Sequence, residues 1–207
     1  MSDQSEAVEA AESSEAAELT ALEQYASDLT DKFGAIRYEV AFDTVRVFVE
    51  PDKWVETIVA AREDLELFSW LSAIDWSKTT EVGEGVRDPD SLVERFEVLC
   101  RLSSMRPHNA DAVIFVAVLE KSDPSIASLT EFIGGAAWHE REAHEMFGID
   151  FVGNENLIPL YLPDEFVGNP LLKSYPLISR EVKPWPGEVD VEPMPEADPK
   201  PEGGGAS

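Results

Sequence analysis

The chain has 207 residues, with 42 acidic and 16 basic side chains and a formal net charge of −26. A surface this acidic repels nucleic-acid phosphates and anionic lipids, so neither nucleic-acid binding nor direct membrane insertion is expected. The single cysteine, Cys100, forms no internal disulfide and cannot alone hold a zinc ion or an iron–sulfur cluster. There is no run of 18 apolar residues and no apolar leader at the start, so a cytoplasmic protein is expected.

The charge is distributed unevenly along the chain. Residues 1–17 carry five acids and no base, which predicts a disordered acidic arm. Residues 182–207 carry six acids, two lysines and six prolines, which predicts a disordered Pro-rich acidic tail. The arm contributes −5 and the tail −4, so −17 remains on the rest of the chain. An acidic body of this kind is typical of a well-solvated surface, of a salt-rich cytoplasm, or of a protein with a basic partner.

Apolar periodicity divides the body into helices and strands. In chain order the pattern predicts a helix over 19–33, a hairpin of strands 36–42 and 45–49, a helix from Pro51 to Ala61, and strands over 68–76, 96–101 and 112–119. A turn at Asp43-Thr44 closes the hairpin, and residues 81–89 form a loop rich in glycine and charge. The run 112–119 is apolar throughout, which is typical of a central strand. These elements predict an α+β fold over 18–148, with a mostly antiparallel sheet flanked by helices.

A further helix is predicted over 136–147, where Gly148 ends it. Successive helical residues rotate by about 100°, which places Glu140 in the apolar stripe and Glu145 on the opposite, polar side. A carboxylate in an apolar stripe needs an arginine, backbone donors or a proton. Glu140 is therefore expected to be satisfied within the fold or by a group on another chain. By the same reasoning Glu140→Ala weakens assembly more than Glu145→Ala.

The histidines of this helix raise the alternative of a metal site. His139 and His144 are five residues apart, so they lie about 140° apart around the helix and do not share one ion. Glu140 and His144 are four residues apart and lie on one side of the helix, and the only other histidine is His108. A free-standing metallohydrolase that uses Glu140 and His144 is therefore the alternative function from a different class.

Residues 149–181 form a segment that we call the strap. It is rich in apolar residues, but its prolines exclude a long helix. An irregular segment of this length in a compact chain is usually functional. We therefore predict a long extended docking strap that contacts another subunit, with wrapping back onto the chain's own sheet as the alternative.

The helix and the strap resemble a known family. The run W-H-E-R-E-A-H-E-M-F-G-I-D-F at 138–151 is close to the W-x-E-R-E-x-x-D-M-F-G-I-x-F motif of the 30-kDa subunit of respiratory complex I. Further motifs of that family resemble R-F-E-V at 95–98, L-P-D at 162–164, G-N-P at 168–170 and Y-P-L at 175–177. The resemblance covers about 68–177 well. Asn154 and Asn169 stand where the family usually has histidines.

The resemblance implies a non-catalytic scaffold or assembly subunit of the proton-pumping NADH-quinone oxidoreductase. Such a subunit lies in the hydrophilic arm, at the cytoplasmic side of the cell membrane, and packs against the subunits that form the quinone site and the terminal iron–sulfur cluster. It holds no cofactor or metal itself, whereas the parent complex carries FMN, iron–sulfur clusters and quinone. The equivalent subunit of a membrane-bound hydrogenase, or of another donor-linked relative, is the alternative within the same class.

The resemblance also implies which residues form the subunit interface. Glu140 is expected to satisfy its charge within the fold or at the joint, whereas Arg141 and Glu142 are expected to form ion pairs across it. The full interface set is Glu140, Arg141, Glu142, Leu157, Leu160, Leu162, Pro163, Asp164, Gly168, Pro170, Lys173 and Tyr175.

Overall fold

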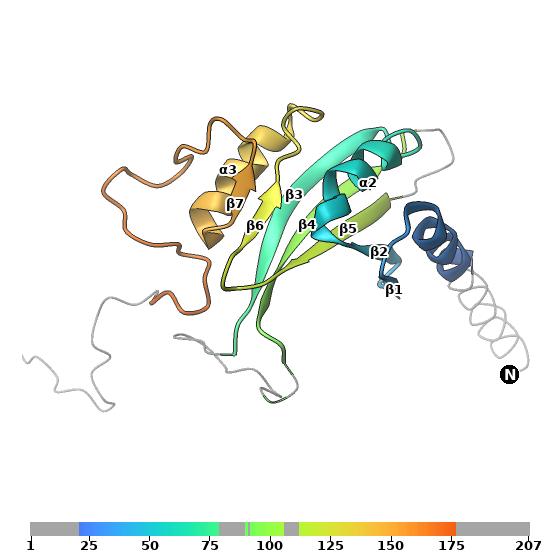
Figure 1. Ribbon diagram of the computed structural model, residues 1–207, viewed down its shortest axis with the longest axis horizontal. Coiled ribbons are helices and arrows are strands. Elements are labelled where there is room, and N and C mark those ends of the chain that lie inside the picture. The colour runs from blue at the N-terminus through green and yellow to red at the C-terminus, as the bar shows by residue number, and fades with distance from the viewer. Residues whose placement is uncertain (1–20, 79–89, 91, 106–111, 177–207) are drawn as a thin grey trace, which may run out of the picture. The chain divides into compact units, whose positions relative to one another are not determined.

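The computed structural model describes residues 21–78, 90, 92–105 and 112–176, which belong to one compact unit (Figure 1). The predicted acidic arm, the loop at 81–89, the Pro-rich tail and the last five residues of the strap, 177–181, lie outside the described residues. Within them, helices flank a mostly antiparallel sheet, so the predicted α+β fold is confirmed.

Five strands form the main sheet, in the order β1-β2-β5-β4-β3. Their bounds are β1 Arg37–Ala41, β2 Thr44–Val49, β3 Leu67–Trp76, β4 Arg95–Ser103 and β5 Ala112–Leu119. Neighbouring strands pair antiparallel, except that β2 and β5 pair parallel. β5 lies in the middle of the sheet, as its continuous apolar run predicts, with β2 on one side and β4 on the other.

The β1–β2 hairpin turns at Phe42 and Asp43, one residue earlier than predicted. Both residues have positive φ, +52° and +54°, as in the two-residue turns whose twist matches that of the flanking strands. The sequence placed the turn at Asp43-Thr44 because Phe42 continues the apolar alternation of β1. Phe42 instead lies at the tip of the hairpin, where it is 97% exposed.

The main core lies on one face of the sheet. The helix over 21–33 and α2 (Trp54–Ala61), which follows the short 3-10 turn η1 (Pro51–Lys53), contribute to it. Trp54 is fully buried in this core, and Phe33 packs edge-on against Phe115 of β5 with ring centroids 5.9 Å apart. The predicted helices 19–33 and 51–61 are therefore present within the described residues, and they cover the inward-facing side chains of the strands.

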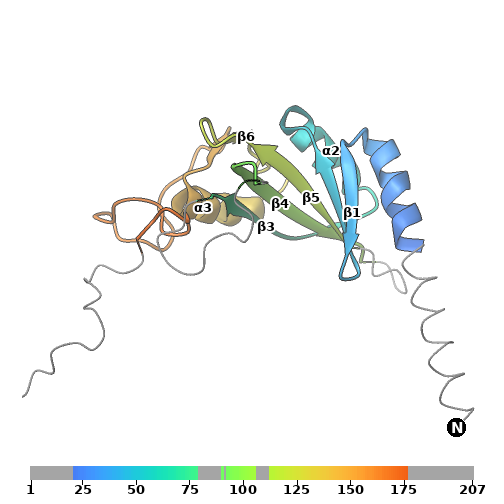
Figure 2. The ribbon, with the colours of Figure 1, turned by 90° about the horizontal axis from the view of Figure 1, so that it is seen from below.

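α3 (Ala136–Phe147) lies against the edge strand β3, beyond the end of the sheet that is opposite β1 (Figure 2). Nδ1 of His139 lies 3.1 Å from the Leu71 carbonyl oxygen of β3, and its ring packs edge-on against Phe68. α3 ends at Gly148, whose φ of +75° is the left-handed conformation that glycine favours at this position. The helix therefore covers an edge whose backbone groups would otherwise be open.

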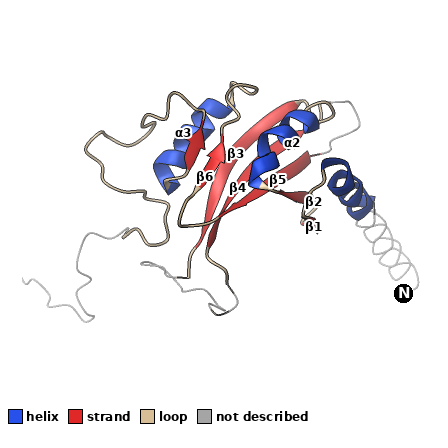
Figure 3. Ribbon diagram, in the orientation of Figure 1, coloured by secondary structure: helices blue, strands red, loops and turns tan. Residues whose placement is uncertain are grey.

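A second, small sheet joins the start of the strap to the body. It pairs β6 (Ser125–Ala127) in parallel with β7 (Asp150–Val152) and buries Ile126 and Phe151. The predicted strap includes residues 150–152, but in the structure they form the strand β7. The sequence did not reveal this strand, because three residues are too few to show a periodic pattern. The strap from 153 to 176 has neither helix nor strand and appears as tan loop in Figure 3.

Candidate functional site

Glu140 lies in the apolar stripe of α3 and has no exposed surface. Its Oε1 accepts the backbone N–H of Leu129 at 2.7 Å, and its Oε2 accepts the Ser128 hydroxyl at 2.7 Å and the Asn154 side-chain amide at 2.9 Å. Ser128 follows β6 and Asn154 follows β7, so one carboxylate connects α3 to the ends of both small strands. The charge is satisfied within the fold by neutral donors, which was one of the two outcomes expected from the sequence.

The geometry does not favour a metal site at Glu140 and His144. Both Glu140 oxygens are engaged in the bonds just described, and Nδ1 of His144 lies 2.8 Å from the carbonyl oxygen of Ile149. In the part of the chain that the structure describes, no group of three or more His, Cys, Asp or Glu side chains is placed to hold a metal ion. These side chains hold α3 and its neighbours in place, so the metallohydrolase hypothesis gains no support.

Glu145 lies five residues after Glu140 on α3 and binds the strap. Its carboxylate accepts three consecutive backbone N–H groups, from Leu160 at 3.1 Å, Tyr161 at 2.9 Å and Leu162 at 2.8 Å. Burial alone would raise the pKa of Glu145, but these N–H groups and the nearby Arg141 charge outweigh burial and lower the pKa below its ordinary value. The carboxylate is therefore ionised wherever the strap is bound at neutral pH.

The sequence reasoning placed Glu145 on the side of α3 away from the apolar stripe. In the structure the strap crosses that side and leaves Glu145 only 9% exposed. The family motif carried a signal for this role, since it has an acid at the position of Glu145. Periodicity alone could not reveal it, because the covering residues lie 15 to 17 positions later in the chain.

Arg141 also binds the strap rather than standing free. Its Nε donates to the carbonyl oxygen of Ile158 at 2.9 Å, and its Nη2 donates to that of Pro159 at 2.7 Å. Glu142, the other residue expected to form ion pairs across the joint, is partly exposed and has no hydrogen-bond partner among the described residues. The two neighbouring charges therefore differ: Arg141 is engaged within the chain, whereas Glu142 is available to a partner.

The second half of the strap is bound to the end of α3 and to β3. The side-chain amide of Asn169 donates to the Glu145 carbonyl oxygen at 2.9 Å, and the Leu171 N–H donates to that of Met146 at 3.1 Å. The N–H of Lys173 donates to the Asp75 carboxylate at 2.9 Å. The first two bonds satisfy carbonyl groups that the last turn of a helix leaves open.

Asp75 is a second buried carboxylate that receives the strap. It is 3% exposed at the end of β3 and accepts the Ser77 hydroxyl at 2.6 Å in addition to the Lys173 N–H. Lys121 forms an ion pair with it at 3.1 Å. Burial raises the pKa of Asp75, but these donors and the Lys121 charge lower it by more, so the net shift is downward.

The body therefore holds the strap chiefly through the backbone of the strap. As a consequence, large apolar side chains of the strap remain exposed: Ile158 at 55%, Tyr161 at 63%, Phe166 at 38%, Val167 at 84% and Leu171 at 53%. Between the strap and α3 there is a hollow of about 190 Å³, lined by residues that include His144, Leu157, Leu162, Phe166 and Asn169. The strap wraps back onto its own domain and at the same time presents an apolar outer surface.

The predicted interface residues fall into three groups by exposure. Glu140 is buried; Pro163, Asp164 and Gly168 are exposed; the others, all partly buried, are Arg141, Glu142, Leu157, Leu160, Leu162, Pro170, Lys173 and Tyr175. The structure brings all of them to α3 or to the strap that it binds. The sequence reasoning missed the most exposed apolar residues of the strap, because exposure there depends on which backbone groups the body binds.

Comparisons with known proteins bear on this arrangement. No helix among the described residues is long and apolar enough to cross a membrane. The family described as "Respiratory-chain NADH dehydrogenase, 30 Kd subunit" matches residues 47–181, which include α3 and the whole strap. A subunit of the NADH-quinone oxidoreductase of Citrifermentans bemidjiense is 35% identical over 145 residues, which cover 70% of this chain and 82% of that protein.

Two solved structures share the fold. The trypsin-resistant fragment of Nqo5 has a TM-score of 0.50 at 18% identity and covers 66% of this chain and 98% of that one. The membrane-bound sulfane sulfur reductase, an archaeal respiratory membrane complex, includes a chain with a TM-score of 0.53 at 17% identity, covering 69% of this chain and 77% of that one. At these identities the likeness concerns the fold alone. On the family match and the relative from Citrifermentans bemidjiense, the chain belongs to the 30-kDa subunit family of the respiratory-chain NADH dehydrogenase.

Proposed function

We propose that this chain is a non-catalytic scaffold subunit in the hydrophilic arm of a proton-pumping NADH-quinone oxidoreductase. One observation carries the proposal: the body binds the strap by its backbone and leaves the large apolar side chains of the strap exposed. An apolar surface of this kind is typical of a protein–protein interface. In this proposal the strap docks against the subunits that form the quinone site and the terminal iron–sulfur cluster.

The buried charged groups support a structural rather than a chemical role. Glu140, Glu145 and Asp75 each accept several hydrogen bonds from groups of the same chain, so their charges serve to fix α3, the small sheet and the strap. The proposal therefore assigns FMN, the iron–sulfur clusters and quinone to other subunits of the complex. It places this chain at the cytoplasmic side of the cell membrane as a peripheral component.

The joint itself is proposed to combine apolar and charged contacts. Tyr161 and Val167 are the most exposed large apolar side chains in the described part of the strap, and we assign them to the centre of the apolar contact. Glu142 has no partner among the described residues, so it is the α3 charge that we assign to an ion pair with the neighbouring subunit. Arg141 then acts indirectly, because it orients the strap that carries the apolar side chains.

Affinity purification from solubilised membranes tests the proposal. The tagged full-length chain is expected to copurify with the hydrophilic-arm subunits, with bound iron and with NADH-quinone reductase activity that the isolated chain lacks. A stable monomer without partners, from cells that make the protein, would contradict it. The same sample distinguishes the alternative parent complexes. A neighbouring subunit of a hydrogenase would carry paired Cys-x-x-Cys nickel ligands in its sequence. A relative that uses another electron donor would not oxidise NADH.

A further inference from the structure

The face of the main sheet that is opposite the main core carries its own apolar cluster. We call it the open face and define it by Phe48, Trp70, Ile74, Leu99, Ile114 and Val116. Strand register brings these residues to one side, because Phe48 pairs with Val116 and Val116 pairs with Leu99 across neighbouring strands. No helix among the described residues contributes to this cluster, whereas three helices contribute to the core on the other face.

The centre of the open face is buried, but its margin is not. Phe48, Leu99 and Val116 are at most 6% exposed, whereas Trp70, Ile74 and Ile114 around them are only partly buried. Ser72, which pairs with Leu99 next to the centre, is exposed. The open face thus has a small apolar centre with aromatic and branched side chains around it, a composition typical of interface cores.

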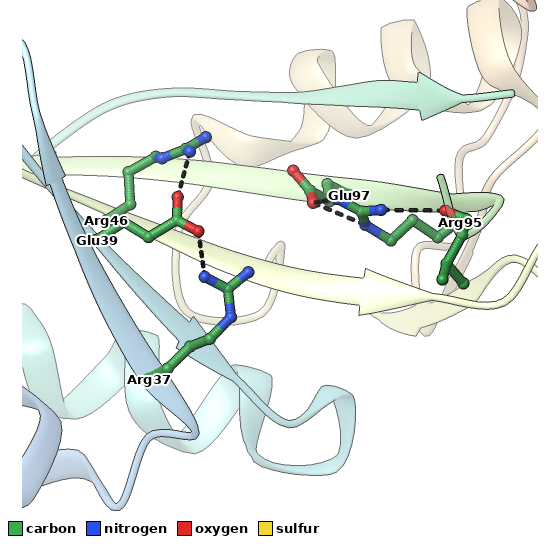
Figure 4. A network of polar contacts seen from close by, with 6 residues as sticks. Arg37, Glu39, Arg46, Arg95 and Glu97 are labelled. Carbon is green, nitrogen blue, oxygen red and sulfur yellow. Dashed lines mark hydrogen bonds and ion pairs between the residues drawn. The ribbon is translucent and has the colours of Figure 1, made fainter. Parts of the chain in front are cut away.

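Charged residues surround the apolar centre of the open face, and their net charge is positive, whereas that of the whole chain is negative. Glu39 is bound by both Arg37 and Arg46, and Glu97 is bound by Arg95 at 2.8 Å (Figure 4). With Arg101, the described residues of the face include four arginines and two glutamates, a net charge of +2 on a chain of −26.

The arginines of the open face are not equivalent. Arg37 lies over the Phe48 ring, with its Cζ 3.4 Å from the ring centroid, so it covers the apolar centre. Arg101 lies between Ile114 of β5 and Trp70 of β3 in the strand register, and it has no ion-pair partner among the described residues. It is therefore a partly exposed positive charge in the middle of an apolar surface, where a carboxylate would be bound most strongly.

The size of the open face limits what it can bind. The five strands hold 38 residues, which at about 4.8 Å between strands and about 3.3 Å per residue give a face of about 600 Å². A stable interface between two folded proteins buries about 800 Å² on each side, so this face alone fits one helix or a short extended segment. A second copy of this chain does not fit face to face, because its own open face also carries +2.

We propose that the open face binds an acidic, amphipathic segment of a neighbouring subunit. The aliphatic or aromatic side chains of that segment pack on Trp70 and Ile114, and one of its carboxylates binds Arg101. The inference rests on the proposed function, since it requires that the chain is a subunit of a complex. It adds a second joint, separate from the strap.

Site-specific photo-cross-linking in the assembled complex tests this proposal. Benzoyl-phenylalanine replaces Ser72 in the tagged full-length chain, the complex is purified from membranes and irradiated, and the adduct peptide is identified by mass spectrometry. The expected result is an adduct with another subunit, at a peptide with more Asp and Glu than Lys and Arg. Arg101→Glu is expected to lower the adduct yield about tenfold, whereas Arg101→Lys, which keeps the charge, retains most of it.

The outcomes separate the two proposals. If the complex assembles and Ser72 gives no adduct, or an adduct with lipid, with a second copy or with a basic peptide, the inference is overturned and the proposed function stands. An adduct yield that is unchanged by Arg101→Glu also overturns it. If the chain does not copurify with a membrane complex, both proposals fail. Thermal unfolding of the isolated variants checks that Arg101→Glu leaves the fold intact, as expected for a residue without an ion-pair partner among the described residues.

Discussion

Replacing Glu145 by alanine removes the acceptor of three consecutive strap N–H groups. A hydrogen bond to a charged group contributes about 1.5 kcal/mol, so the three together contribute about 4.5 kcal/mol to the closed strap. Each 1.4 kcal/mol is a factor of ten in the opening equilibrium, so Glu145→Ala is expected to open the strap roughly a thousandfold more often. The sheet does not depend on these bonds, so its stability should change little.

Hydrogen exchange of the isolated full-length chain measures this effect directly. Peptides covering 158–164 are expected to lose their protection in Glu145→Ala, and peptides from β4 and β5 are expected to keep theirs. Glu145→Gln retains an acceptor for two of the three N–H groups but places its NH₂ against the third, so it should fall between wild type and alanine. Glu142→Ala, on the same helix but without a strap contact, is the matched control. Exchange in 158–164 that is unchanged by Glu145→Ala would refute the reasoning.

Three other predictions follow from the buried groups and from the end of α3. The pKa values of Glu145 and Asp75 are lowered, so the strap should be fully bound above the ordinary carboxyl pKa of about 4. It should be released as the pH falls through the lowered values, which the amide NMR signals of Leu162 and Lys173 would report. Glu140→Ala removes the acceptor of three hydrogen bonds and should cost about 3 kcal/mol in urea denaturation; a cost under about 0.5 kcal/mol would contradict the described bonds. Gly148→Ala should cost about 1–2 kcal/mol because of its positive φ, and an unchanged midpoint would show that the helix ends differently.

The helices and the five strands of the main sheet could be predicted because each depends on local pattern, whereas the short strands β6 and β7 could not. β5 was recognised as central from its unbroken apolar run, and α3 was bounded correctly by the periodicity of its residues and by Gly148. The strand order could not be predicted in the same way. The parallel pairing of β2 with β5 joins segments that are more than 60 positions apart, and neither segment carries a local sign of the other.

The candidate site was predicted in part. The apolar stripe of α3 correctly marked Glu140 as buried, because helical geometry alone decides that position. The partners of Glu140, Glu145 and Asp75 could not be predicted, because they are hydroxyl, amide and backbone donors of distant segments. Asn154 and Asn169 show the same limit: they looked like departures from the family motif, yet both donate hydrogen bonds that hold the fold or the strap.

The structure also shows how the charged residues are distributed over the described part of the chain. A net charge of −26 suggested a solvated surface or a basic partner. The described residues show that charge is not uniform, since arginines gather on the open face while α3 uses its acids to bind the strap. The whole-chain charge therefore excludes classes of partner, whereas the local charges indicate where a particular partner binds.

Cysteine labelling of the strap tests the central claim most directly. Val167→Cys places a thiol at a strap position that is 84% exposed, and Cys100 adds little background, because it is fully buried and because burial and the Glu140 charge raise its pKa. In the isolated chain the new thiol is expected to react as fast as a free cysteine. In the assembled membrane complex it is expected to react at least about a hundredfold more slowly, because the strap is then covered by its neighbour. Equal labelling rates in the isolated chain and in the complex would contradict the docking role of the strap.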